Sequence, residues 1–213
     1  MQTELLIARL ARQAEPVRVL PPPRTQLRRW ALVSLASVVA GVAWFGVRSD
    51  AATRLVSPDF LVRVGLVLAL ATTAARQALS SSVPGDEPDG FRRVVPPLLL
   101  ALWAGAIAWP LLGPSMVERL AAVRWHPACA WQMAIVAAAP AAWMFRQIGR
   151  AAPWALGWTS VQAALAASAA GALAAQGICG LDGAGHQLLW HVVPLLVMTG
   201  ATGLAARPWL RQH

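Results

Sequence analysis

The chain has 213 residues, of which 57% are hydrophobic and only 13% are charged. A soluble globular protein carries about 25% charged residues, so this composition indicates an integral membrane protein and leaves no room for a large soluble domain. All 18 basic residues are arginines, and membrane topology accounts for the net charge of +9 without a nucleic-acid partner.

The N-terminal segment is polar, and residues 3–14 are predicted to form a short helix. Leu5, Leu6 and Leu10 belong to its apolar side. A helix of this length is marginal alone in water, so we expect it to fold on a protein partner or to lie on the lipid surface. Residues 1–29 are too long and too polar for the start of a signal peptide, so we expect no cleavable leader.

Six apolar runs follow, and each has about the length of roughly 20 residues that a membrane-spanning helix needs. They cover residues 30–47, 58–79, 94–112, 128–145, 153–176 and 188–205. The predicted fold is an all-α integral membrane protein, a bundle of six transmembrane helices. The chain then divides into an arm (1–28), a six-span membrane domain (29–206) and a tail (207–213).

Arginines set the predicted orientation of the bundle. Thirteen of them lie on the side of the two termini, and five lie on the opposite side. Positively charged loops stay in the cytoplasm, so we expect both termini to be cytoplasmic. The loop over residues 177–187 has no arginine and is expected outside. Arg63, which falls within a predicted span, is expected to extend its side chain to the interface.

The fifth run is rich in small residues. It has one at every fourth position, namely Ala163, Ala167, Gly171 and Ala175. Small residues at this spacing let helices approach closely in lipid, so the run is predicted to be an internal packing helix. The same face leaves a homo-oligomer open. Most tryptophans fall near interfaces, whereas Trp44, Trp103 and Trp109 are predicted to pack against other helices.

Both cysteines of the chain fall where a predicted span meets an outer loop. Cys129 starts the fourth span and Cys179 follows the fifth, so a disulfide is geometrically possible if these spans are neighbours. A static disulfide is one interpretation, because an oxidising outer compartment preserves such bonds. Another is a metal site of both thiols, His126 and either His186 or His191, since thiolate and imidazole suit zinc or copper.

Several segments, in their order along the chain, resemble the NrsF-like family of six-span bacterial anti-sigma factors. They are TELLIARLARQAEPVRVLPPP at the N-terminus, LVSPDFLVRVGLVLALATTAA and the SVPG after it, HPACAWQMAIVAAAPAAWMFR with the first cysteine, and GICGLDGAGHQLLWHVVPLLV with the second. Together they cover nearly the whole chain. The resemblance implies a regulator in the bacterial inner membrane that is not an enzyme, needs no cofactor and makes no direct contact with nucleic acid.

The resemblance also implies a partner and the residues that bind it. The arm would hold an extracytoplasmic-function sigma factor at the lipid bilayer and keep it from RNA polymerase. The arm contacts would be Leu5, Leu6, Leu10, Val17 and Leu20. Cys129 and Cys179 would form a redox-sensing pair, and their oxidation or modification would release the sigma factor.

A membrane enzyme that uses the outer Cys/His cluster for redox or metal chemistry is the alternative function. A haem protein needs facing histidines within its spans, and only His191 falls inside one. The acidic residues lie in loops or at the ends of spans, which argues against a proton-coupled transporter.

Overall fold

The structure is a computed structural model, which describes residues 2–13, 20–83, 85, 89–113, 116, 123, 125–151, 153 and 155–210. Its long helices are α2 (Pro23–Phe45), α4 (Pro58–Ser80), α5 (Gly90–Ala108), α7 (Ala128–Ile148), α8 (Leu156–Ile178) and α10 (Val193–Leu210). The shorter elements are α1 (Gln2–Gln13), α3 (Ala51–Arg54), the 3-10 helix η1 (Trp109–Leu112), α9 (Ala184–Gln187) and the π-helix η2 (Leu188–Val192).

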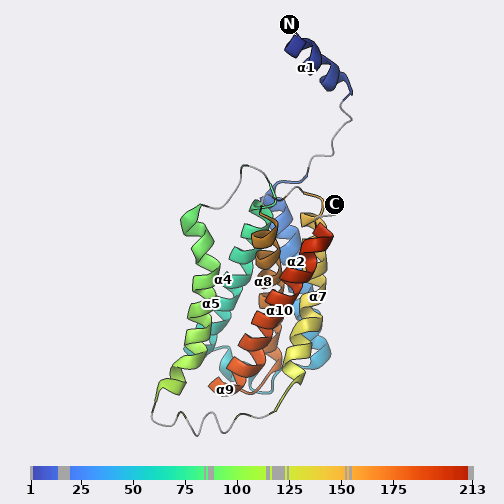
Figure 1. The fold of residues 1–213 in the computed structure, drawn as a ribbon. Helices are drawn as coiled ribbons and strands as arrows, with labels where there is room; N and C mark the ends of the chain where they lie inside the picture. The colour runs from blue at the N-terminus through green and yellow to red at the C-terminus, as the bar shows by residue number, and fades with distance from the viewer. Residues whose placement is uncertain are drawn as a thin grey trace.

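Every regular element in the described residues is helical, which confirms the all-α prediction. Six segments of this part of the chain are long and apolar enough to cross a membrane, so the protein is a multi-pass membrane protein. η1 extends the segment of α5, and α9 and η2 lead into that of α10. The six run side by side as one bundle, and α2 begins at the same end of it at which α10 finishes (Figure 1).

The first spanning helix begins at Pro23, well before the predicted start at Trp30. A proline suits the first helical position, because its fixed φ matches the helix and the N–H it lacks would be unpaired there. Gln26 stabilises this end by donating from Nε2 to the carbonyl of Pro21 over 2.7 Å. The predicted start was wrong because the apolar run begins only after several charged residues, whereas the helix already includes them. Arginines such as Arg28 are exposed there, so their charges do not prevent helix formation.

α8 is the centre of the bundle, since 78% of its apolar 18-residue window is buried and it packs against α4, α7 and α10. This confirms the prediction of an internal packing helix. The approach to α7 is closest at Gly171, where a Cβ atom would lie 2.4 Å from the carbonyl oxygen of Met133. Only a glycine permits this distance, so the small-residue face holds α7 and α8 together.

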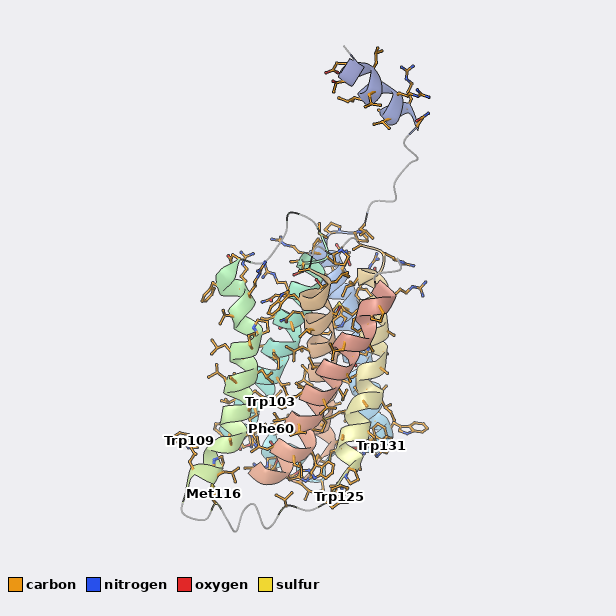
Figure 2. All side chains as sticks on the ribbon, in the orientation of Figure 1. Phe60, Trp103, Trp109, Met116, Trp125 and Trp131 are labelled. Carbon is orange, nitrogen blue, oxygen red and sulfur yellow. The ribbon has the colours of Figure 1, made fainter. Side chains whose placement is uncertain are left out.

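The three tryptophans predicted to pack against other helices differ in how far they are buried. Trp103 is fully buried between helices, whereas Trp44 is 85% exposed and Trp109 is 74% exposed. Trp109 lies at the outer edge of the bundle (Figure 2). The packing prediction is therefore wrong for Trp44 and Trp109, because a side chain in a membrane bundle can satisfy its apolar surface with lipid instead of protein.

Candidate functional site

Cys129 and Cys179 lie together at the end of the bundle opposite to the start of α2. Cys129 is the second residue of α7, and Cys179 is the residue that directly follows α8. Their Sγ atoms are 3.5 Å apart, and both side chains are buried. The close packing of α7 on α8 explains this proximity, because it brings the start of one helix beside the end of the next.

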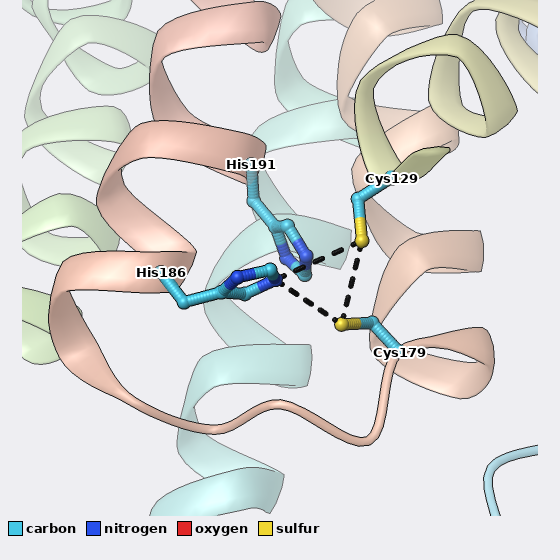
Figure 3. A group of neighbouring side chains, drawn as sticks. All are labelled: Cys129, Cys179, His186 and His191. Atoms are coloured by element: carbon cyan, nitrogen blue, oxygen red, sulfur yellow. Dashed lines mark hydrogen bonds between the residues drawn. The ribbon is translucent and has the colours of Figure 1, made fainter. Parts of the chain in front are cut away.

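Two histidines complete a compact group with the thiols. His186 Nε2 lies 3.7 Å from the Sγ atom of Cys129 and 3.4 Å from that of Cys179 (Figure 3). One ligand atom from each of Cys129, Cys179, His186 and His191 lies within 4.8 Å of all the others. All four residues are buried. We refer to these four residues as the Cys/His group.

The π-helix η2 positions His191 in this group. It spans Leu188–Val192, so the wide turn includes His191 itself. Pro194 follows and has no N–H to donate back to the carbonyl of Trp190, which weakens the regular α-helical pattern at this point. Single π-turns often occur at functional sites. The sequence analysis missed this element, although the proline soon after the Trp-His pair was the available signal.

The histidine nitrogens of the group are poorly satisfied. Within the described part of the chain, no hydrogen bond of ordinary length and angle reaches either ring nitrogen of His191 or Nδ1 of His186, although His191 lies close enough to Cys179 to lower the pKa of its thiol. His191 is 1% exposed and His186 is 4% exposed, so bulk solvent does not reach these nitrogens. Buried polar atoms without partners are uncommon and costly, which makes these nitrogens candidates for ligand binding.

Apolar side chains surround the thiols. Trp190 packs against both cysteines together with the half-buried Ala130 and Leu181. The ring of Trp125 meets Trp190 edge to face, with centroids 4.9 Å apart. The hydrogen bond from Cys129 lowers the pKa of the Cys179 thiol, while burial acts in the opposite direction.

His126 lies outside the group, which differs from the metal site predicted from the sequence. Its side chain is exposed, and its ring centroid is 6.0 Å from that of His186. Pro127 ends the preceding loop and starts α7, so His126 precedes the helix that carries Cys129. The structure thus brings together both alternatives of the prediction, His186 and His191, and leaves His126 at the edge.

A buried arginine ties the loop of Cys179 to the end of α2. Arg48 has a side chain that is 1% exposed, and it donates to Asp50 over 2.6 Å and to Asp182 over 2.5 Å. Its backbone N–H also donates to the carbonyl of Gly177 over 3.0 Å. The hydrogen bonds to Asp50 and then Asp182 raise the pKa of Arg48 against the effect of burial, and Arg48 lowers the pKa of Asp50 to about 2.

Arg63 extends its side chain back along α4 to the end of its span, where Asp59 is 58% exposed. It pairs with Asp59 one turn earlier in α4, and its Nη1 donates to Gln187 over 3.1 Å. Gln187 in turn donates to Asp182 over 3.2 Å. Arg63 therefore reaches the end of its span, in the direction that snorkelling requires, and its hydrogen-bond partners offset the cost of its burial. Sequence reasoning missed this polar cluster, since its members lie far apart along the chain.

The predicted arm contacts fall on a helix whose apolar side is uncovered. α1 places Leu5, Leu6 and Leu10 at 56–68% exposure. Leu20, just before α2, is half-buried, and Val17 lies outside the described residues. Every described side chain of α1 is exposed, so the rest of the described chain does not bury the leucines.

One protein-family model matches residues 10–212, and its description is NrsF, negative regulator of sigma F. No curated protein and no solved structure matches the chain. The family match spans the bundle and the end of α1, so it covers both the Cys/His group and the segment that leads from α1 to α2.

Proposed function

Since the chain belongs to the NrsF family of negative regulators of sigma F, we propose that it is a membrane-bound anti-sigma factor. Its N-terminal arm holds an extracytoplasmic-function sigma factor at the membrane. Oxidation or modification of Cys129 and Cys179 weakens this hold and releases the sigma factor. The observation that carries the proposal is the separation of the two functional ends, with an uncovered apolar helix before α2 and a buried thiol pair at the far end of the bundle.

The proposed orientation places the arm in the cytoplasm and the thiols in the periplasm of a bacterium. The arginine distribution supports it, because positively charged loops remain in the cytoplasm. An even number of spanning segments also returns the chain to the side from which it started. The periplasm is oxidising, so oxidants are present on the side of the membrane at which the thiol pair would lie.

The exposed leucines of α1 support the binding role of the arm. Leu5, Leu6 and Leu10 leave a large part of their apolar surface uncovered. An amphipathic helix typically binds a protein groove through apolar residues spaced three or four positions apart. A helix of 12 residues is marginal alone in water, so binding and helix formation would support each other.

Oxidation of the pair needs only a small movement. A hydroperoxide converts one thiolate to a sulfenic acid and is itself reduced to an alcohol or water. The second thiol then attacks the sulfenic sulfur, and the disulfide forms with loss of water. The sulfur atoms must approach from 3.5 Å to roughly the 2.0 Å of a disulfide bond.

Arg48 supplies a route from the thiols to the helix that carries the arm. A shift of Cys179 displaces the loop that contains Asp182, and Asp182 is bound by Arg48. Arg48 also holds the carbonyl of Gly177 and lies shortly after the end of α2. A change at the thiols therefore acts on α2 through direct contacts, and α2 leads back to the arm.

Capture from membranes tests the proposal. The full chain and a chain without residues 2–13 are purified from host membranes in mild detergent, with and without prior hydroperoxide treatment. We expect a sigma factor with the full chain, none with the deletion, and a loss of at least about tenfold after oxidation. The variant with Cys129→Ser and Cys179→Ser should keep the sigma factor after oxidation. Absence of any sigma factor from the full chain in cells that express them, or equal release from the double variant, would contradict the proposal.

A further inference from the structure

We propose that Cys129, Cys179, His186 and His191 bind one tetrahedral metal ion of the thiolate-seeking class, Zn²⁺ or Cu⁺, while the thiols are reduced. This site is independent of the sigma factor, because all four ligands come from the membrane domain. His126, which the sequence analysis included, is not a ligand in this proposal.

The distances between the donor atoms match those around a tetrahedral ion. Zn–S bonds of ~2.3 Å and Zn–N bonds of ~2.0–2.1 Å place two sulfur ligands ~3.8 Å apart and a sulfur and a nitrogen ~3.6 Å apart. The structure has 3.5 Å between the two sulfurs, and 3.7 Å and 3.4 Å from them to Nε2 of His186. These three donors thus need to shift by only a few tenths of an ångström. The fourth donor, on His191, lies within 4.8 Å of the others.

The unpartnered histidine nitrogens supply the second, independent observation. His191 points into the group from η2, and within the described residues no hydrogen bond of ordinary length and angle reaches either of its ring nitrogens (Figure 3). A buried imidazole in this state carries an uncompensated cost of desolvation, which a bond to a metal removes. Apolar side chains, Trp190 and Leu181 among them, surround the group, so a bound cation would be the main polar partner of the histidine nitrogens.

Charge balance favours binding in a buried position. Each thiol releases a proton when it becomes a metal ligand, so two thiolates neutralise Zn²⁺ while the neutral imidazoles add no charge. Two thiolates with Cu⁺ leave one net negative charge, and soft thiolates are nonetheless preferred ligands of Cu⁺. A neutral Zn²⁺ site is thus the less costly of the two among apolar side chains.

The site is closed, which indicates a structural or regulatory ion rather than a catalytic one. Four protein ligands fill a tetrahedral shell and leave no position for water or substrate. The ligands join the start of α7, the end of α8, α9 and η2. If the proposed thiol switch operates, a disulfide and the metal exclude each other, because the disulfide consumes both sulfur ligands.

Direct metal binding by the full-length protein in detergent tests the proposal. The reduced chain is stripped with a chelator without oxygen, and Zn²⁺ or Cu⁺ is added in separate arms. We expect about one ion per chain in at least one arm. We also expect both thiols to be alkylated more slowly with the ion than in the stripped chain, which mass spectrometry detects in the unmutated chain. Binding in the Zn²⁺ arm alone or the Cu⁺ arm alone identifies the ion and supports the site.

Substitutions then identify the ligands. His186→Gln and His191→Gln should each weaken binding by more than about 100-fold, since loss of even an outer partner of a metal ligand costs roughly 10–100-fold. His126→Gln is the matched control and should bind as the unmutated chain does. The proposal is overturned if the reduced chain binds neither ion and its thiols stay reactive, or if both histidine variants bind normally. Capture of the sigma factor by the arm is measured separately, so failure here leaves that proposal standing.

Discussion

Arg48 shows how a single residue organises the end of the bundle near the thiols. Its guanidinium is almost fully buried, and two carboxylates and the carbonyl of Gln176 receive its N–H groups. A buried charge is costly unless it is paired, so we expect the hydrogen-bond network to depend on the Arg48 side chain. Arg54 binds the same Asp182 over 2.7 Å from a more exposed position, with 30% of its side chain accessible.

Replacing Arg48 with glutamine should destabilise the membrane domain. Removal of a buried partner costs up to about 3 kcal/mol here, because Asp182 is largely desolvated but keeps Arg54, and Asp50 is partly exposed to solvent. Thermal unfolding of the detergent-solubilised protein measures the loss as a lower Tm. Arg54→Gln is the control and should cost less than about 1 kcal/mol, since exposed pairs contribute little. Equal shifts in Tm for the two variants would refute the central role of Arg48.

At the scale of elements, the close contact between α7 and α8 sets the geometry of the thiols. Gly171 meets the backbone of Met133, which lies one helical turn beyond Cys129 on α7. The recurrence of small residues at every fourth position of α8 could be recognised in the sequence, because it depends only on local spacing. The positions of the six spans were predicted for the same reason, since a long apolar run is a local property.

Other features of the structure depend on contacts between residues that are far apart in the sequence, and a local sequence pattern does not reveal such contacts. The sequence marked His186 and His191 as alternatives, and only the π-helix η2 with the loop before it brings both to the same sulfurs. Arg63 was expected to reach the lipid interface, but its partner Gln187 lies far away in the sequence and no local pattern indicated it. The start of α2 was predicted too late, because hydropathy identifies the part of a helix that lies in lipid and not the residue at which the helix begins.

Gly171→Ala should separate α7 from α8 and slow disulfide formation. The added methyl group meets a backbone carbonyl that has no freedom to rotate away, and overpacking of this kind costs about 1–3 kcal/mol. The rate of loss of free thiols under a mild oxidant, followed by maleimide labelling, measures the effect. Gly105→Ala, at a helical position with nothing nearby, should oxidise like the unmutated chain. Unaltered kinetics in Gly171→Ala would show that this contact does not control the pair.

At the scale of the whole molecule, the bundle separates α1 from the Cys/His group. α1 stands apart from the six helices, whereas the Cys/His group lies at the far end (Figure 1). α2 is the element that leads from the arm to the end near the thiols, where Arg48 meets the loop after α8. α2 therefore offers a direct covalent path for the proposed signal between the two ends.

Leu6→Glu should weaken capture of the sigma factor without affecting the bundle. Leu6 is 56% exposed on α1, so its replacement leaves the membrane core intact. Loss of one buried leucine contact plus burial of a charge should cost at least about 2 kcal/mol, which lowers the affinity roughly 30-fold. Ala8→Glu, on the opposite side of the helix, adds the same charge and should bind nearly normally. Equal weakening by both variants would assign the effect to charge rather than to the apolar side.

The Cys/His group is also completed late along the chain. Cys129 belongs to the fourth spanning segment, Cys179 follows the fifth, and His191 lies near the start of the sixth. During synthesis the last of these side chains leaves the ribosome only after five segments have been made. A truncated or stalled chain therefore keeps its thiols uncovered, whereas a fully inserted chain shields them. Accessibility of the two thiols thus reports on the biogenesis of the protein.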